Sequence, residues 1–396
     1  MERSTHARTR SQRAPLHART HSGGGSTERL TRARMRDLRS MVVDDVDLLQ
    51  LVFSHCAVRD FRAASLVCYQ WRKGVQHAVA AWRCRQGLYL VGGCCDGVHP
   101  ASAKAVRAVY KYDLVGDEWV PCAALRKARD HLGLIGWGGR LHALGGWSGS
   151  RNRASCETYE PSLDMWYTAS QRLQTARSGL AAAVSPRGKC FALAGWGGAH
   201  TGFLSTAECL EELDVPEPSN PDGGDSATPS PRSASSASLR TARHCPAAAT
   251  VDTVLYVAGG SGSEAEGAAA QPMASVEKLE MEAPQGEWSS NVAPMLFPRY
   301  RHTLVSLGGA LYACGGQKPD GRATASTERY DPRADRWVEV APMRRPRFSH
   351  AAATLDGALY VVGGFVGGTW LTSVERCEHS QHAGPGPEQP ACEPRT

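Results

Sequence analysis

Arginine side chains gather in the segments that link the apolar runs of this 396-residue chain. A guanidinium group binds carboxylates and phosphates through paired hydrogen bonds, so these segments suit acidic or phosphorylated peptides. Aromatic residues in the same segments offer apolar anchors for such a ligand. The candidate target-binding residues are Arg126, Arg151, Arg153, Arg301, Arg322, Arg344, Arg345, Trp147, Trp196 and Trp370. The alternative is that these arginines are solvated surface charges, the commoner state of loop arginine.

The sequence lacks the common enzyme motifs. No GxSxG pattern follows an expected strand and opens a helix, and no GxxxxGK[ST] phosphate loop occurs. The 13 cysteines contain no CxxC pair. Several histidines keep the spacing of the sequence repeat described below, which indicates repeat structure rather than one metal site. They are His131, His142, His200, His244, His302 and His350. We therefore expect no enzymatic activity, no metal and no cofactor.

The positive charge of the chain belongs to its beginning. Residues 1–40 hold ten arginines and three acids (Glu2, Glu28 and Asp37). The formal charge of this segment, 10 − 3 = +7, is larger than the net charge of +6 of the whole chain. The remainder is close to neutral, which argues against nucleic acid as a partner. We expect residues 1–40 to be a disordered basic leader, with a transit peptide as the alternative. No apolar run is long enough to predict a membrane span.

An apolar run that ends in two small residues recurs six times. The first small residue of each doublet stands at position 92, 145, 194, 259, 315 and 363, at intervals of about 50 residues. A period of this length is typical of a propeller built from repeated four-stranded sheets. In one unit the expected strands are 302–307, 310–316, 326–332 and 336–342. Each doublet lets the chain turn sharply, because glycine adopts positive φ freely.

Other residue types keep the same phase and are interpreted as scaffold. An arginine precedes five of the doublets by 16 or 17 residues, and a glutamate follows five of them; a tryptophan closes most units and would press one sheet on the next. The arginines are Arg129, Arg177, Arg243, Arg299 and Arg347, and the glutamates are Glu157, Glu208, Glu277, Glu328 and Glu375. Because strands alternate in direction, the loops after the second and fourth strands share one face, which carries the candidate target-binding residues.

Three units depart from the pattern. The third has no tryptophan, and residues 215–240 in its place are rich in Pro, Ser and Asp, which predicts a disordered insertion. The sixth ends after Cys377 without a fourth strand, and 379–396 is expected to be a disordered tail. The first begins at its second strand. The first and sixth units are therefore expected to be incomplete.

Residues 88–378 resemble kelch-repeat proteins, most clearly in APMRRPRFSHAAATLDGALYVVGG (341–364). The resemblance implies a mainly β fold, a six-bladed kelch-type β-propeller whose first and sixth blades lack a strand. Such propellers bind protein partners.

Residues 44–83 resemble an F-box, most specifically in SLVCYQW (65–71), although Asp44-Asp45 stand where that family has its opening Leu-Pro. The resemblance implies three small helices that bind the Skp adaptor of a cullin–RING ubiquitin ligase. The adaptor-binding residues would be Leu48, Val52, Phe53, Leu66, Val67 and Trp71. The alternative is that these helices only cap the propeller.

Together these features predict a non-catalytic substrate receptor. The F-box would recruit the Skp adaptor and cullin, and the propeller would hold a target protein, acidic or phosphorylated, with neither nucleic acid nor a membrane as partner. The alternative is a kelch interaction scaffold, for example on the cytoskeleton, without a link to ubiquitin transfer. The unpaired cysteine pattern favours free thiols and an intracellular location, cytoplasmic or nuclear.

Overall fold

The computed structural model describes residues 87–95, 104–113, 116, 118–210, 233–262, 270–282, 286–355, 357–378 and 393–395. The chain divides into two units, Met1–Ala81 and Trp82–Thr396, and every described residue belongs to the second. These residues form strands, turns and loops without a helix, which confirms the mainly β class. Among the described residues there is accordingly no helix that could cross a membrane. The leader 1–40 and the expected helices of 44–83 lie outside the described residues, as do Leu48, Val52, Phe53, Leu66, Val67 and Trp71.

Most strands of the described residues belong to six antiparallel sheets, each built from consecutive segments of the chain. The first three sheets are β1 (Leu88–Val91), β4 (Val109–Asp113) and β5 (Glu118–Cys122); β6 (Gly133–Trp137), β7 (Arg140–Leu144), β8 (Ser155–Glu160) and β9 (Met165–Arg172); and β10 (Ala181–Val184), β11 (Cys190–Leu193), β12 (Ala207–Leu210) and β13 (Ala234–Ser236).

The other three sheets repeat the same up-and-down order. They are β14 (Ala247–Val251), β15 (Val254–Ala258) and β18 (Val276–Glu280); β19 (Thr303–Leu307), β20 (Ala310–Cys314), β21 (Thr327–Asp331) and β22 (Arg336–Val340); and β23 (Ala351–Leu355), β24 (Ala358–Val362), β27 (Val374–Glu378) and β28 (Glu393–Arg395). Short two-stranded ribbons extend three loops: β2 (Cys94–Cys95) with β3 (Lys104–Ala105), β16 (Ser261–Gly262) with β17 (Gln271–Pro272), and β25 (Phe365–Val366) with β26 (Thr369–Trp370).

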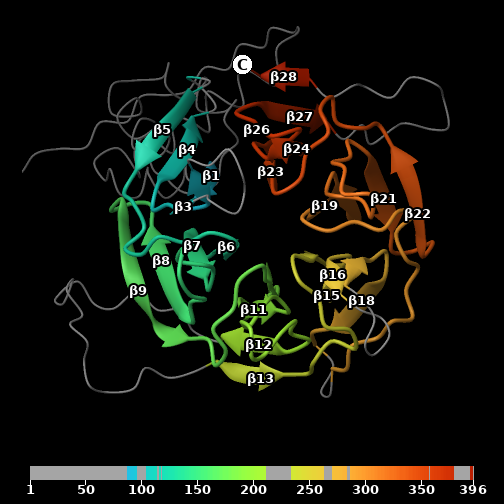
Figure 1. Ribbon diagram of the computed structural model, residues 1–396, viewed down its shortest axis with the longest axis horizontal. Coiled ribbons are helices and arrows are strands. Elements are labelled where there is room, and N and C mark those ends of the chain that lie inside the picture. Colours follow the sequence, from blue (N-terminus) through green and yellow to red (C-terminus); the bar gives the residue numbers. More distant parts are fainter. Residues whose placement is uncertain are drawn as a thin grey trace, which may run out of the picture. The chain divides into compact units, whose positions relative to one another are not determined.

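The sheets follow one another around a common centre, with the first strand of each toward the middle and the last toward the outside (Figure 1). An apolar cluster fills each junction between neighbouring sheets, as Val91 and Tyr159 do between the first and second. Leu88 of the first sheet and Tyr360 of the sixth share another cluster. The last sheet therefore packs on the first and closes the circle.

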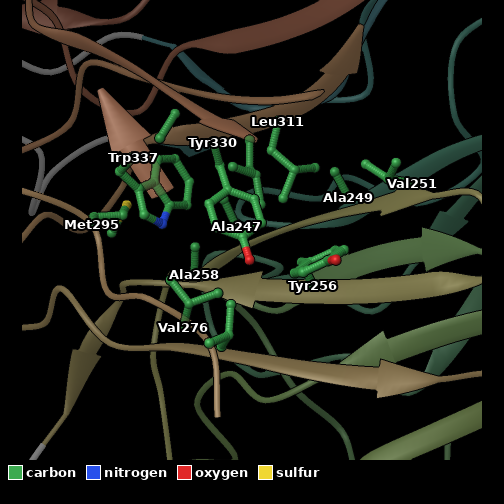
Figure 2. Packing of buried hydrophobic residues seen from close by; sticks show 13 residues of the cluster. Ala247, Ala249, Val251, Tyr256, Ala258, Val276, Met295, Leu311, Tyr330 and Trp337 are labelled. Atoms are coloured by element: carbon green, nitrogen blue, oxygen red, sulfur yellow. The ribbon is translucent and has the colours of Figure 1, made fainter. Parts of the chain in front are cut away.

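Tryptophans complete these junctions as the sequence predicts. Trp337 packs against Tyr330 and Met295 in the cluster between the fourth and fifth sheets (Figure 2). Its ring centre lies 5.0 Å from that of Tyr330, and its indole N–H donates to the carbonyl of Ala293 at 2.9 Å. The ring thus buries a large apolar face while its one polar group is satisfied by the preceding loop.

The phased arginines and glutamates form buried ion pairs. Arg129 is fully buried, and its Nη2 lies 2.8 Å from Oε1 of Glu157. Its Nη1 donates to the carbonyls of Gly145 and Ser155, and Nη2 donates to the Ser155 hydroxyl. We call this arrangement the Arg–Glu clamp. It recurs as Arg177 with Glu208, Arg243 with Glu277, Arg299 with Glu328, and Arg347 with Glu375.

The hydroxyl of the clamp is a repeated feature that the sequence analysis missed. A serine or threonine stands two residues before each clamp glutamate, and its side chain accepts from the arginine in every sheet that has a clamp. These residues are Ser155, Thr206, Ser275, Ser326 and Ser373. The spacing of these residues from the glutamates is visible in the sequence. Only the fold shows that their hydroxyls accept hydrogen bonds from the clamp arginines.

The small-residue doublets have the backbone shape that was expected. Gly145 and Gly146 have φ of 58° and 96°, which is left-handed. A Cβ at Gly145 would stand 2.7 Å from the carbonyl oxygen of Arg177, so the next loop leaves no room for a side chain. The third unit tolerates Ala194 at this place with φ of 57°. The doublet therefore permits both the turn and the close approach of the clamp.

The described part of the first sheet begins at β1, its expected second strand, and it differs from the other sheets in exposure. Leu90 is 37% exposed, although the matching residue of every other sheet is fully buried. Tyr110 stands where the other sheets have the clamp glutamate, and it is 40% exposed. Within the described residues, this sheet has neither the glutamate nor the hydroxyl of a clamp.

Two expectations about strands were wrong. The sixth sheet does have a fourth strand, because the C-terminal β28 pairs with β27 in the register Val374↔Arg395. The expected insertion 215–240 is too long, because β13 within it pairs with β12 as the fourth strand of the third sheet. Both are short strands at the outer edge of a sheet, where pairing with an existing strand outweighs weak local propensity. Residues 211–232 lie outside the described residues.

The cysteines of the described residues are mostly free thiols, as expected. Seven are free, and five of these are buried. Cys377 is the exception, since it is disulfide-bonded. It lies in β27, the strand that pairs with the C-terminal segment.

Breaking one clamp should destabilise the fold strongly. Arg299→Met removes the guanidinium from a fully buried pair and leaves the Glu328 carboxylate without its counter-charge. We expect the free energy of unfolding to fall by about 3–5 kcal/mol. The exposed control Arg322→Ala should change it by no more than about 0.5 kcal/mol. Urea unfolding followed by tryptophan fluorescence measures both changes. An Arg299→Met variant with the same urea midpoint as the natural protein would contradict a structural role for the clamp.

Candidate functional site

The loops after the second strand and the loops between sheets meet on one face, which we call the loop face. Asp130, in the loop before β6, exchanges two backbone hydrogen bonds with Trp147, in the loop after β7, at 2.8 and 2.6 Å. The next sheet pairs Ser178 with Trp196 in the same way. The structure therefore brings the predicted loops together, as the parity of the strands requires. The role of this face in binding a target stays a prediction.

Five residues at the entrance to the innermost strands form a chain of backbone hydrogen bonds from sheet to sheet. The N–H of Gly179 donates to the carbonyl of His131, Cys245 donates to Gly179, Arg301 to Cys245, and Ser349 to Arg301, at 2.8 to 3.2 Å. All five have left-handed φ between 50° and 57°. We call these residues the axial ring. Its four hydrogen bonds link the second to the sixth sheets through their backbones.

Arg301 is the cation of the axial ring. Its guanidinium lies over the ring of Tyr300 at 5.3 Å and over that of Phe348 at 5.9 Å. Its Nε is buried and has no hydrogen-bond partner. The Nε atoms of the clamp arginines Arg299 and Arg347 are in the same state, so this feature alone does not mark a binding site. Unlike the clamp arginines, Arg301 forms no ion pair with another described residue.

Aromatic side chains surround the axial ring in two groups. Trp196 packs edge-on against Phe203 at 5.3 Å, and Phe203 stacks on His244. Phe365 packs edge-on against both Phe348 and Trp370. The second group therefore continues directly from the rings that lie beneath Arg301. Of the predicted aromatic anchors, Trp196 and Trp370 belong to these groups, while Trp147 lies in the loop that pairs with Asp130.

The remaining predicted arginines occupy two kinds of position. Arg126, Arg344 and Arg345 are exposed, and their backbone N–H groups donate to clamp glutamates. Arg151 and Arg322 are exposed in loops after the second strand.

Arg153 is half-buried, and its Nε donates to the carbonyl of Ala128 at 3.0 Å. Burial lowers the pKa of this guanidinium from its ordinary value. Arg153 is thus part of the scaffold.

Sequence reasoning missed what makes Arg301 special. It singled out the charge but not the two rings beneath it, which are Tyr300, the neighbour in the chain, and Phe348 in the next inter-sheet loop. It also missed the left-handed backbone two residues after each clamp arginine. The one usable signal was position, because His131, Gly179, Cys245, Arg301 and Ser349 all stand at that spacing.

Titratable groups near the axial ring are held in their neutral forms. Burial raises the pKa of the Cys245 thiol to about 11, which disfavours the thiolate. Burial also lowers the pKa of His244 to about 4 and that of His350 to about 3, and it lowers the pKa of His302 well below its usual range. Both ring nitrogens of His302 are buried without a partner. These imidazoles are therefore neutral packing groups at physiological pH.

The described fold and its repeats can now be compared with known proteins. The family model of the Kelch motif matches residues 242–290, 298–344 and 346–376. The chain therefore carries kelch motifs, and the three matched segments coincide with the fourth, fifth and sixth sheets. The solved structure titled "Structure of YjhT" superposes with a TM-score of 0.57 over 78% of this chain and 97% of that one. At 12% identity, this similarity supports a β-propeller fold and nothing further.

Curated relatives match parts of the chain at low identity. Human Kelch-like protein 34 is 26% identical over 58% of this chain, and Beta-scruin of Limulus polyphemus is 26% identical over 61%. F-box/kelch-repeat protein SKIP30 of Arabidopsis thaliana is 30% identical over 32% of this chain. The alignments span only 24%, 25% and 35% of these relatives' own lengths.

Acid should destabilise the fold through its buried imidazoles. A histidine whose pKa is lowered on folding takes up a proton on unfolding, so stability falls as pH drops below about 6.5. For His350, with a pKa of about 3, the loss should approach 1.4 kcal/mol per pH unit below that point. His350→Leu introduces the residue that Leu132 and Leu180 supply at the matching positions, and it should make this dependence less steep, while His244 and His302 keep the remainder.

Urea unfolding at pH 7.0, 6.0 and 5.0 measures the dependence. The exposed control His200→Gln should keep the slope of the natural protein. A slope unchanged in His350→Leu would contradict the assignment of a neutral buried imidazole.

Proposed function

We propose that this protein is the substrate-recognition subunit of an SCF-type (Skp adaptor–cullin–F-box) ubiquitin ligase. Residues 88–395 would form a six-bladed kelch propeller that holds a target protein on its loop face. The F-box-like segment 44–83 would bind the Skp adaptor through Leu48, Val52, Phe53, Leu66, Val67 and Trp71. The chain itself would be non-catalytic and would act by bringing the target close to the partner enzymes.

The observation that carries the target-binding part is the environment of Arg301. Its guanidinium lies on two aromatic rings and forms no ion pair with another described residue. A carboxylate or phosphate of the target would pair with this guanidinium, and the nearby ring of Trp370 would take an apolar part of the same segment. The ligase part is supported by the sequence of residues 44–83 and by the similarity to an F-box/kelch-repeat protein.

A kelch scaffold without a link to ubiquitin transfer is the second candidate. The alignments to Kelch-like protein 34 and Beta-scruin cover 58% and 61% of the chain, more than the 32% aligned with SKIP30. In this alternative the loop face would still hold a protein partner, but no Skp adaptor would bind.

Affinity purification of the full chain distinguishes the two candidates. The natural protein should recover the Skp adaptor and a cullin, and the double variant Val52→Asp/Trp71→Ala should lose both, because it places a charge in the proposed apolar contact and removes its largest ring. Arg301→Gln is the matched control and should keep the adaptor. Recovery of a target protein without adaptor or cullin from the natural chain would support the scaffold instead.

Binding of acidic peptides tests the loop face independently. On a peptide array, the natural protein should prefer sequences rich in Asp, Glu or phosphoserine. Arg301→Gln should weaken the binding of the best of these about 30-fold, the effect of a hot-spot residue of about 2 kcal/mol. The exposed loop variant Arg322→Gln should change it far less. No preference for acidic sequences would rule out this role of Arg301.

A further inference from the structure

The Arg–Glu clamps hold two residues of each inter-sheet loop at the loop face. The backbone N–H of Leu296 donates to Oε2 of Glu328 at 2.6 Å, and that of Phe297 donates to Oε1 at 3.2 Å. The same two bonds recur in the other four clamped loops, so each clamp fixes a pair of neighbouring residues. We call these the corner pairs. They are Arg126–Lys127, Gln174–Thr175, Arg240–Thr241, Leu296–Phe297 and Arg344–Arg345.

The clamp places no demand on the side chains of a corner pair. It binds only backbone N–H groups, and a buried leucine or methionine just before each pair, such as Met295, supplies the local packing. Four corner pairs are accordingly polar or cationic. Leu296 and Phe297 are the exception, with 50% and 41% of their surface exposed.

This exposure calls for an explanation in terms of binding. Single exposed apolar residues are common, but here two large ones are adjacent and held rigidly on the face that carries Arg301. Fixing them in advance lowers the entropy that a partner must overcome on binding. Neither residue belongs to the apolar cluster between the fourth and fifth sheets.

The neighbouring corner pairs indicate the charge of the partner. Arg240–Thr241 precedes this corner around the ring and Arg344–Arg345 follows it, with Arg240 and both arginines of the second pair exposed. An apolar corner pair that lies between two arginine-containing pairs is complementary to an apolar side chain with carboxylates on either side. A second copy of the chain would bring like charge against like at the same place.

We propose that Leu296 and Phe297 form an apolar anchor point on the loop face, which takes a large apolar side chain from an acidic segment of the target protein. The inference rests on the proposed function, since it assumes that the loop face binds a target. It adds that the recognised segment combines carboxylates with a leucine- or phenylalanine-sized residue. Acidity alone would then not define a target.

The repeat itself supplies a matched variant. Leu296→Gln/Phe297→Thr introduces the corner pair that already stands at Gln174–Thr175, so the backbone bonds to Glu328 are retained. Arg126→Gln/Lys127→Thr introduces the same pair at another corner. Because Arg126 is itself a predicted target-binding residue, this variant is the control for the ratio of affinities between peptides and not for the absolute affinity. Both variants should keep the urea midpoint of the natural protein, which establishes that they fold.

Three labelled twelve-residue peptides are the probes, measured by fluorescence anisotropy with the full chain. The first alternates glutamates with two leucines and a phenylalanine, the second replaces these three by serine, and the third replaces the glutamates by glutamine. The natural protein should bind the first about tenfold more tightly than the second, since one large apolar side chain is buried. Leu296→Gln/Phe297→Thr should abolish that difference, and the control should keep it.

The outcomes separate this inference from the function on which it rests. If the first two peptides bind equally to the natural protein, the anchor point is wrong while acidic recognition stands. If neither binds, both proposals fail. If the difference persists in Leu296→Gln/Phe297→Thr, the apolar contact lies elsewhere and the inference is overturned. It is also overturned if sedimentation shows a dimer of the natural protein that this variant converts to a monomer, because a second copy then covers the corner.

Discussion

The structure depends on one buried interaction, the Arg–Glu clamp, which each of five sheets repeats. An isolated buried guanidinium would be prohibitive, but Arg129 donates to the Glu157 carboxylate, two backbone carbonyls and one hydroxyl, so its charge and most of its donors are matched. The carboxylate in turn accepts two backbone N–H groups of the loop that leads into its sheet. One ion pair thus joins the second strand, the third strand and the inter-sheet loop. Apolar packing holds neighbouring sheets together, and the clamp sets how their loops are placed.

The clamp also explains how a repeated scaffold acquires a face with specific chemistry. Because it acts on backbone atoms, the side chains of the corner pairs are free to differ, and they range from Arg344–Arg345 to Leu296–Phe297. The axial ring follows the same logic, since its hydrogen bonds join backbone groups while its side chains include Arg301 and Cys245. A rigid backbone that accepts different side chains lets the same fold carry binding surfaces of different specificity.

The sequence was most informative where a residue type recurs with a fixed spacing. The arginine, glutamate, glycine doublet and tryptophan were all predictable, because their roles are the same in each sheet. The strands β13 and β28 were missed, because Ser- and Pro-rich segments have little strand propensity and pair only when an edge is already present. Arg301 was found as a charge, but its contact with Phe348 was not, because that ring approaches the guanidinium only through the fold.

The described part of the first sheet lacks two members of the clamp together. Tyr110 replaces the glutamate and Ala108 the hydroxyl residue, so the described part of this sheet holds no group that would require a buried guanidinium. Retaining a buried glutamate there without its arginine would cost several kcal/mol, so the members of the set are expected to disappear together. Within the described residues, five junctions therefore have a clamped corner, whereas the first sheet has none and exposes Leu90 and Tyr110 in its strands β1 and β4.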